Sequence, residues 1–254
     1  MKQKILFVIQ ARMGSSRLPG KVLKPLGAWK AIEIVVLRLL SSWSTESLVF
    51  AIPDSVENLP LEDALKSLGV QVFKGSENDV YKRFFDALSN RQNSFFIRIT
   101  ADCPFLSIDL LKRGIEQFEK GNYHIVHTGK SIAEGLDFEI VNTEAFMSLN
   151  EKNLTPIQRE HPTLYFYQNK IDFKIYDLEL EDNADDSNFR ITLDEEEDLV
   201  LLNQVAVHFG KEILSCEWKD IKNYLNYNND LMKINSHIER NEGLKIDSEK
   251  KDKN

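Results

Sequence analysis

One loop near the amino terminus collects residue types that are suited to holding phosphate groups. From Gln10 onward the chain places three cations, Arg12, Arg17 and Lys21, among two glycines and two serines. Glycine lets the backbone approach a ligand and present amides to it, while arginine forks match pairs of phosphate oxygens and lysine adds a mobile charge. The loop follows neither the Gly-x-Gly-x-x-Gly nor the Gly-Lys-Ser/Thr phosphate pattern. It therefore indicates a triphosphate site of another type, with a solvated basic loop as the alternative.

Two aspartates are candidates for a metal ion that would accompany such a phosphate. Asp102 follows an apolar run of strand length and precedes Cys103 and Pro104. Mg²⁺ prefers carboxylate and phosphate oxygens and usually takes one or two carboxylates from the protein, so Asp102 fits a metal ligand, with a turn-forming aspartate as the alternative. Asp194, taken alone, is better explained as a helix N-cap, because Asp194-Glu195-Glu196-Glu197 has the form of a capping box.

The elements that must position these residues alternate between strand and helix in the first half of the chain. Apolar runs of strand length occupy residues 4–9, 48–52, 70–73 and 94–100, and helical periodicity occupies residues 32–40, 61–68, 79–88 and 108–118. This alternation predicts a doubly wound α/β fold, with a mostly parallel sheet and helices on both faces. Ligands of such sheets bind beyond the carboxyl ends of the strands. The loops at residues 10–21 and 100–104 both leave strand ends, so we expect them to face one site.

The second half of the chain is less regular. We expect strands at residues 138–141, 171–178 and 189–193 and helices at residues 155–168 and 194–207. The absence of an internal repeat or a low-complexity linker favours one domain over residues 1–228, with a small inserted lobe at roughly 130–180. A polar tail over residues 229–254 follows, and we expect its end, residues 248–254, to be disordered.

Composition narrows the class of protein. The formal net charge of -8 argues against non-specific nucleic-acid binding, which needs a basic face. The two cysteines, Cys103 and Cys216, form neither a disulfide framework nor a zinc pattern, so we interpret Cys103 as a buried packing residue. No apolar stretch approaches the roughly 18 residues of a membrane span. We expect a cytoplasmic protein without a membrane or nucleic-acid partner.

Six segments in order resemble sugar-acid cytidylyltransferases of the spore-coat-polysaccharide type, which are related to the CMP-Kdo and CMP-neuraminate synthetases. These segments are Ala11-Arg12 to Leu23, Phe73-Lys74-Gly75-Ser76 to Phe84, Arg98-Ile99-Thr100-Ala101-Asp102-Cys103-Pro104, Gly135-Leu136-Asp137-Phe138-Glu139, Arg159-Glu160-His161, and Arg190-Ile191-Thr192-Leu193-Asp194 to Leu199. The resemblance covers roughly residues 4 to 210.

The resemblance implies a fold of the nucleotide-diphosphosugar transferase type and a reaction in which CTP and a sugar acid give a CMP-sugar and pyrophosphate, with Mg²⁺ as cofactor. It assigns Arg12, Lys21 and Asp102 to catalysis and raises Asp194 to a second metal ligand beside Asp102. The implied nucleotide-binding residues are Ala11, Arg12, Gly14, Ser15, Arg17, Lys21, Asp79, Arg83 and Asp102. The implied sugar-acid contacts are Asp137, Arg159 and His161. From spacing alone, Asp79 and Arg83 would equally form a surface ion pair, since they lie four residues apart.

The chain departs from the family pattern in two places. Ala101 stands where the family usually has glycine, and alanine would be strained if this position needed a positive φ. The segment 28–32 also differs, and it precedes a helix near the base pocket and often shapes a subunit contact in the family, which leaves a homodimer open. The sequence consequently specifies the type of reaction more closely than it specifies the nucleotide or the sugar.

Two other functions remain open from the sequence. A glycosyltransferase of related architecture would hold its metal through an Asp-x-Asp pair, but Asp102 is followed by Cys103 and Pro104. A non-catalytic nucleotide-binding paralogue would be expected to lose core residues, but Arg12, Lys21, Asp102 and Asp194 are all present.

Overall fold

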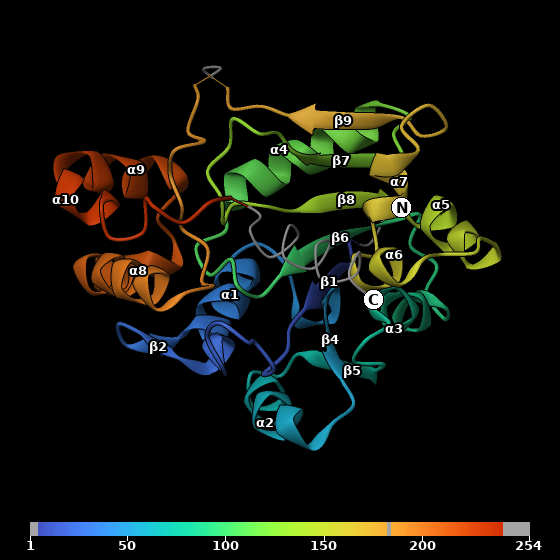
Figure 1. Cartoon of the computed structure of the whole chain (residues 1–254), viewed down its shortest axis with the longest axis horizontal. Coiled ribbons are helices and arrows are strands. Elements are labelled where there is room, and N and C mark those ends of the chain that lie inside the picture. Colours follow the sequence, from blue (N-terminus) through green and yellow to red (C-terminus); the bar gives the residue numbers. More distant parts are fainter. Residues whose placement is uncertain (1–4, 182–183, 241–254) are drawn as a thin grey trace.

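A seven-stranded sheet forms the centre of the computed structural model, which describes residues 5–181 and 184–240 (Figure 1). The strands are β1 (Phe7–Gln10), β4 (Leu48–Pro53), β5 (Gln71–Gly75), β6 (Phe95–Thr100), β7 (Ile125–Thr128), β8 (Glu139–Asn142) and β9 (Ile175–Leu178). Their order across the sheet is β5-β4-β1-β6-β8-β7-β9. Only β8 among them runs antiparallel to its neighbours, β6 and β7. The prediction of a mostly parallel α/β sheet is confirmed.

Helices follow the strands along the chain. They are α1 (Ala31–Leu40), α2 (Leu59–Ser67), α3 (Val80–Leu88), α4 (Ile108–Lys120), α5 (Thr143–Ser148), α6 (Pro156–Glu160), α7 (Leu164–Gln168), α8 (Glu196–Phe209), α9 (Trp218–Tyr227) and α10 (Asn229–Met232). Several helices begin or end at residues whose side chain or backbone favours a helix terminus. For example, Ser107 begins α4 by accepting a hydrogen bond from the Leu110 amide, and Gly69, with φ +72°, follows α2. No helix of the described residues is both long and apolar enough to cross a membrane.

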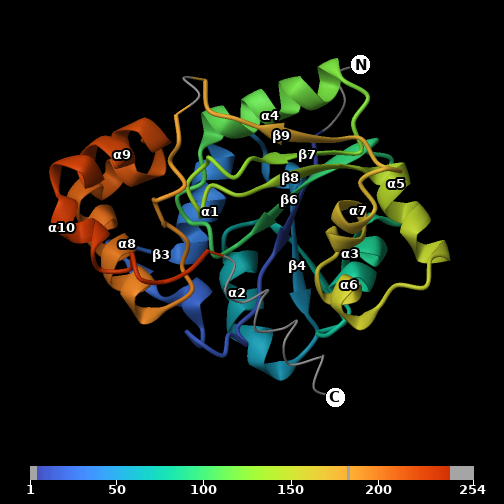
Figure 2. The ribbon, with the colours of Figure 1, turned by 45° about the horizontal axis from the view of Figure 1, so that its top comes forward.

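Both faces of the central strands are buried, and the side chains of a strand alternate between these two faces. In β1, Phe7 and Ile9 join an apolar cluster with α1, α4 and α8, whereas the neighbouring Val8 joins a second cluster with α3, α5 and α7. Figure 2 shows α3, α5, α6 and α7 on one side of the molecule and α8, α9 and α10 on the opposite side. This arrangement explains why the central strands read as continuous apolar runs.

Several predictions for the second half of the chain were wrong. The helix expected over residues 155–168 is two short helices, α6 and α7. The strand expected from residue 171 begins at Ile175, since Ile171 is fully exposed. Residues 189–193 form no strand, because Arg190 makes a single isolated bridge to Glu134 in a neighbouring loop. The helix expected at residues 194–207 is present as α8, and only its start differs, at Glu196.

Some elements were not predicted at all, namely β7, α5, α9, α10 and a hairpin of β2 (Pro25–Leu26) with β3 (Trp29–Lys30). Most of them are short. Residues 130–180, where we expected a small inserted lobe, contribute β8 and β9 to the central sheet and α5, α6 and α7 to one side of it. The expected polar tail contains α10 and continues as packed chain to residue 240. The disorder expected at residues 248–254 lies outside the described residues.

Candidate active site

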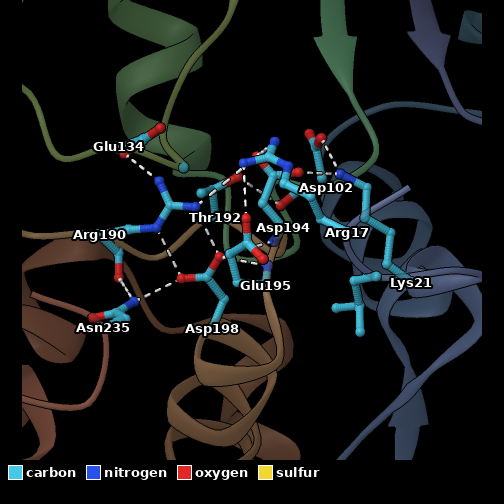
Figure 3. Close-up of polar contacts among 12 residues, drawn as sticks. Arg17, Lys21, Asp102, Glu134, Arg190, Thr192, Asp194, Glu195, Asp198 and Asn235 are labelled. Carbon is cyan, nitrogen blue, oxygen red and sulfur yellow. Dashed lines mark hydrogen bonds and ion pairs between the residues drawn. The ribbon is translucent and has the colours of Figure 1, made fainter. Parts of the chain in front are cut away.

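Two carboxylates that are far apart in sequence converge on one ammonium group (Figure 3). The Lys21 Nζ atom lies 2.7 Å from Asp102 Oδ2 and also donates to Asp194 Oδ1. Lys21 ends the loop at residues 10–21, which follows β1 and which we call the phosphate loop after its predicted role. Asp102 follows β6, which pairs with β1 in parallel. The carboxyl ends of adjacent parallel strands thus bring the loops together, as predicted.

The backbone fixes Asp194 beside Asp102. The Leu193 amide donates to the Asp102 carbonyl at 2.8 Å, and the Thr192 hydroxyl donates to the same oxygen at 3.3 Å. These two bonds tie the segment before α8 to the turn after β6. The two carboxylates therefore meet because their backbones are joined, rather than through Lys21 alone.

A buried aspartate, Asp198, holds the turn that carries Asp194. Asp198 is fully buried, and its carboxylate accepts from Arg190 through two nitrogens at 2.8 Å each. The same carboxylate accepts from the amides of Asp194 and Glu195 at 2.9 and 3.0 Å. Such a paired and fully hydrogen-bonded buried charge is one that a protein interior tolerates.

This network corrects the expected role of Asp194 as the N-cap of the helix. The N-cap of α8 is Glu195, and Asp198 is the residue that bonds back to it. The Asp194 carboxylate points instead toward Lys21 and toward Arg17, whose NH2 atom lies 3.0 Å from Asp194 Oδ2. Arg17 NH1 lies 3.0 Å from Glu195 Oε1, so the turn before α8 holds two cations of the phosphate loop.

The charges in this cluster stabilise one another. Burial alone would lower the pKa of Lys21, but Asp102 and Asp194 outweigh it and raise that pKa above its ordinary value. Burial would likewise raise the pKa of Asp102, but Lys21 dominates and holds it well below the ordinary value for aspartate. Lys21 therefore stays a cation and Asp102 an anion at neutral pH.

The donor set fits Mg²⁺ with help from a substrate. Among the described residues no group of three or more His, Cys, Asp and Glu side chains could hold a metal ion. Asp102 and Asp194 offer two carboxylates, each partly exposed and close enough to share one cationic group. Mg²⁺ commonly takes one or two protein carboxylates and completes its shell with water and substrate phosphates. The pair is consistent with that pattern.

A cavity of about 260 Å³ opens beside these carboxylates. Its walls are Arg98, Thr100, Asp102, Cys103, His127, Thr128, Glu134, Asp137, Phe138, Glu139, Tyr167, Thr192 and Asp194. Arg98 is the only arginine among these lining residues, and none of them is a lysine. Cys103 contributes a thiol whose pKa is raised well above the ordinary value, first by burial and then by nearby carboxylates, so it is a packing residue and not a thiolate nucleophile.

Arg98 and Glu139 form a cross-strand pair in the floor of this cavity. Arg98 in β6 donates to Glu139 Oε2 in β8 at 2.7 Å and to Gln10 Oε1 at 3.2 Å. Glu139 also accepts from the hydroxyls of Tyr167 and Thr163, at 2.6 and 3.0 Å. The Arg98 Nε atom is buried and finds no hydrogen-bond partner within residues 5–181 and 184–240. A buried donor of this kind is costly unless a partner arrives.

A second pocket of about 440 Å³ contains other predicted residues. It is lined by Arg12, Ser76, Glu77, Asn78, Asp79, Pro156, Arg159 and Glu160. Arg159 NH1 lies 2.8 Å from Asp79 Oδ2, and the other oxygen of Asp79 caps α3 by accepting from the Lys82 amide at 2.8 Å. The structure thus brings Arg12, Asp79 and Arg159 together, but it does not bring Arg159 to the cavity that Asp137 lines.

Arg83 is buried beneath this second pocket. Only 1% of it is exposed, and it donates to the Ser76 carbonyl. Burial, and then the charge of Arg12, lowers its pKa to about 10. The interpretation of Asp79 and Arg83 as a surface ion pair was therefore wrong, because the Arg83 side chain points inward and Asp79 pairs with Arg159.

The remaining predicted residues lie along the phosphate loop or near α6. Ala11 is buried after β1, Gly14 is exposed, and the Ser15 hydroxyl accepts from the Leu18 amide at 3.2 Å. His161 ends α6 and lies at its junction with α7. Ala101, which replaces a glycine of the family, is buried, and its amide donates to the Gln10 carbonyl at 2.9 Å.

Sequence reasoning gave no role to Asp198 or Glu139, and it considered Arg98 for the carboxylate of the acceptor only after Arg159. Asp198 was visible as the fourth residue after Asp194 in the last resembling segment, but burial decides its role and no local pattern reveals burial. Arg98 and Glu139 also lay within resembling segments. Their pairing needed β8 to lie beside β6, which sequence order alone does not predict.

Comparisons with known proteins identify a family and several relatives that this chain resembles. A family model described as cytidylyltransferase matches residues 6–227. The spore coat polysaccharide biosynthesis protein SpsF of Bacillus subtilis is 34% identical over 200 residues, covering 76% of this chain and 82% of SpsF. The 8-amino-3,8-dideoxy-manno-octulosonate cytidylyltransferase of Shewanella frigidimarina is 27% identical over 175 residues, covering 67% of each chain. The structure of a cytidylyltransferase from Leptospira borgpetersenii aligns with a TM-score of 0.84 at 29% identity, covering 91% of this chain and 97% of that one.

Proposed function

We propose a specific reaction for this chain on the premise that it belongs to the cytidylyltransferase family. In this proposal it couples CTP to a sugar acid, giving a CMP-sugar and pyrophosphate for the synthesis of a surface polysaccharide or glycan. The observation that carries the proposal is the convergence of Lys21, Asp102 and Asp194 at the end of the phosphate loop, beside a cavity that contains Arg98. We place the reaction in the cytoplasm, since both cysteines are free and a reducing compartment suits them.

The phosphate loop would hold the triphosphate. Arg12, Arg17 and Lys21 lie along one loop, and fixed cations there stabilise charge that develops on a pyrophosphate leaving group. Mg²⁺, held by Asp102 and Asp194, would supply further positive charge against the phosphates when bound. Because Asp198 and the Leu193 amide hold the Asp194 turn beside Asp102, the two carboxylates are already placed together before a ligand binds.

The cavity beside this cluster would hold the acceptor acid. The name of the Shewanella relative gives a sugar acid as its substrate, which supports an acid here as well. Arg98 is the lining cation, and its Nε atom lacks a partner, so we assign the carboxylate of the acceptor to Arg98 rather than to Arg159. Arginine suits this role because its planar fork matches a carboxylate.

The proposal is tested by measuring pyrophosphate release from CTP, UTP, ATP and GTP, each with Mg²⁺ and a panel of sugar acids. The proposal expects release that depends on both CTP and one acid. Release without any acceptor, or equal use of all four nucleotides, would contradict it. A glycosyltransferase would release no pyrophosphate from any of the four.

A further inference from the structure

The chain continues into the site beyond the part that matches the family model. That match ends at residue 227, but α10 and the segment after it, residues 233–240, pack back against the site. In Figure 1 the red segment after α10 turns toward the centre of the molecule, near the end of β6. The segment makes this turn because two of its side chains have partners in the loops of the site.

Two side chains anchor this segment to the two loops of the site. Asn235 is buried, and its Nδ2 atom donates to Asp198 Oδ1 at 2.8 Å and to the Arg190 carbonyl at 3.1 Å. Arg240 NH1 donates to the carbonyls of Lys130 and Ile132, at 3.0 and 2.8 Å. Asn235 thereby supports the turn that carries Asp194, and Arg240 holds the loop before β8.

Arg240 also pairs with a residue that lines the cavity. Its NH2 atom lies 2.9 Å from Asp137 Oδ1, which accepts from the Thr128 hydroxyl at 3.2 Å as well. The second oxygen, Asp137 Oδ2, accepts from the Gly135 amide at 2.9 Å. Each oxygen of Asp137 is therefore engaged, and Arg240 is the cation that balances it.

This balance matters for an acceptor that is itself an anion. The cavity is lined by five carboxylates, those of Asp102, Glu134, Asp137, Glu139 and Asp194, and by one arginine. Without Arg240, Asp137 would present an unbalanced negative charge to a sugar acid, and like charges in a partly buried site repel one another. The side chains of Arg240 and Asp137 are 26% and 41% exposed, so solvent weakens the pair without screening it completely.

We propose that Arg240 is a positioning residue that fixes Asp137 and the loop at residues 130–137 for binding of an anionic acceptor. It acts through Asp137, because it does not line the cavity itself. The role in acceptor binding rests on the proposed function. The segment beyond residue 227 thereby takes an indirect part in selecting the acceptor, through its contact with Asp137.

The test compares the wild-type protein with Arg240→Ala and with Lys233→Ala. Lys233 is a matched control from the same segment, since it is exposed and pairs with Asp230 rather than with a residue of the site. We expect Arg240→Ala to raise the KM for the acid at least about tenfold, as loss of a charge-assisted hydrogen bond would, and to leave the KM for CTP within about twofold. An acid KM that moves no more than in Lys233→Ala would overturn the proposal, and so would an equal rise in both KM values.

A double-mutant cycle separates positioning from general support of the fold. If Arg240 acts through Asp137, Arg240→Ala should change the acid KM much less in an Asp137→Asn background than in the wild type. Equal effects in the two backgrounds would overturn the assigned route.

Failure of the proposed function would look different. In that case the wild-type protein would show no turnover with CTP and any acid, and hydrogen exchange would decide the inference. Faster amide exchange at residues 130–137 in Arg240→Ala, with no such change in Lys233→Ala, would support Arg240 as the residue that positions this loop. Unchanged exchange there would overturn it.

Discussion

At the scale of single residues, the site is built from charges that balance in pairs. Lys21 lies between Asp102 and Asp194, Arg98 pairs with Glu139, and Arg190 pairs with Asp198. Removing one member of such a pair leaves the other buried without a partner, which costs more than the pair itself contributes. Substitutions at this scale are therefore most informative when they keep shape and remove charge.

Asp102→Asn is such a substitution. It keeps the size of the side chain and removes the negative charge that faces Lys21 and the proposed metal. We expect turnover to fall at least about a hundredfold, the scale of losing one preorganised electrostatic group, while thermal unfolding shows a folded protein. Turnover near that of the wild type would remove Asp102 from the mechanism.

Arg98→Ala tests the contact to the carboxylate of the acceptor. In the wild-type protein we expect a sugar acid to react far better than its analogue with the carboxylate reduced to an alcohol. In Arg98→Ala this preference should shrink at least about tenfold, because the charged partner is gone. The preference is the ratio of the rates with the acid and with the alcohol, both measured on the same variant. A change in the amount of folded protein affects both rates equally and cancels in this ratio.

Arg159→Ala is the control for this experiment. Arg159 pairs with Asp79 in the second pocket, so its loss should leave the preference for acid over alcohol unchanged. If Arg159→Ala removes the preference and Arg98→Ala keeps it, the carboxylate binds where the sequence first suggested.

At the scale of elements, the site depends on loops that are fastened to one another. The loop before β8 lies against the segment that leads to α8. The Ile191 amide donates to the Glu134 carbonyl at 2.7 Å, and the Glu134 amide donates to the Phe189 carbonyl at 3.0 Å. Gly135 makes this approach possible. Its φ is +103°, and a Cβ atom there would lie 2.4 Å from the Ile191 carbonyl carbon.

Gly135→Ala should consequently destabilise the protein more than a glycine substitution in open space. Gly69→Ala is the matched control, since Gly69 also has a positive φ, +72°, but nothing lies within 4 Å of its Cβ position. We expect Gly69→Ala to lower the free energy of unfolding by about 1 kcal/mol. The added clash in Gly135→Ala should cost at least about 2 kcal/mol more. Equal losses in denaturant unfolding would show that the loop is not packed this closely.

Glu139 fastens β8 to α7, and its contribution should depend on pH. Burial alone would raise the pKa of Glu139, but Arg98, Tyr167 and Thr163 together lower it below the ordinary 4.5. A carboxyl whose pKa is lower in the folded state stabilises the fold fully above its unfolded pKa, and that stabilisation is lost as the pH falls through the folded pKa. The wild type should therefore exceed Glu139→Gln in free energy of unfolding at pH 6 to 7, and this difference should shrink below about pH 4.5. A difference that stays constant from pH 7 to pH 3 would contradict the pairing.

The sequence predicted the elements of the first half well and those of the second half poorly, for a physical reason. Runs such as residues 4–9 and 94–100 are apolar throughout because both faces of a central strand are buried. In the second half, β7 and β9 have four residues each, and the backbone of residues 190–193 is hydrogen-bonded to loops rather than to a neighbouring strand. Short elements that are stabilised by distant contacts leave little periodicity in the sequence.

At the scale of the whole molecule, the order of the strands determines which distant residues meet. Placing β1 beside β6 brought Lys21 to Asp102, and this could be predicted because parallel strands open their loops at one edge. The antiparallel β8 brought Glu139 to Arg98, and the segment after α10 brought Arg240 to Asp137. Neither of these contacts follows from a local pattern, so the acceptor side of the site needed the structure.

The identity of the product tests the central claim most directly. The wild-type protein is incubated with CTP, Mg²⁺ and the sugar acid that supports the fastest pyrophosphate release. The products are then separated, and their masses are determined by mass spectrometry. We predict one new compound with the mass of CMP joined to the acid through loss of water, formed in equal amount to pyrophosphate and not formed by Asp102→Asn. Pyrophosphate that appears with free CMP and an unchanged acid would contradict the claim, since it would show hydrolysis of CTP without transfer.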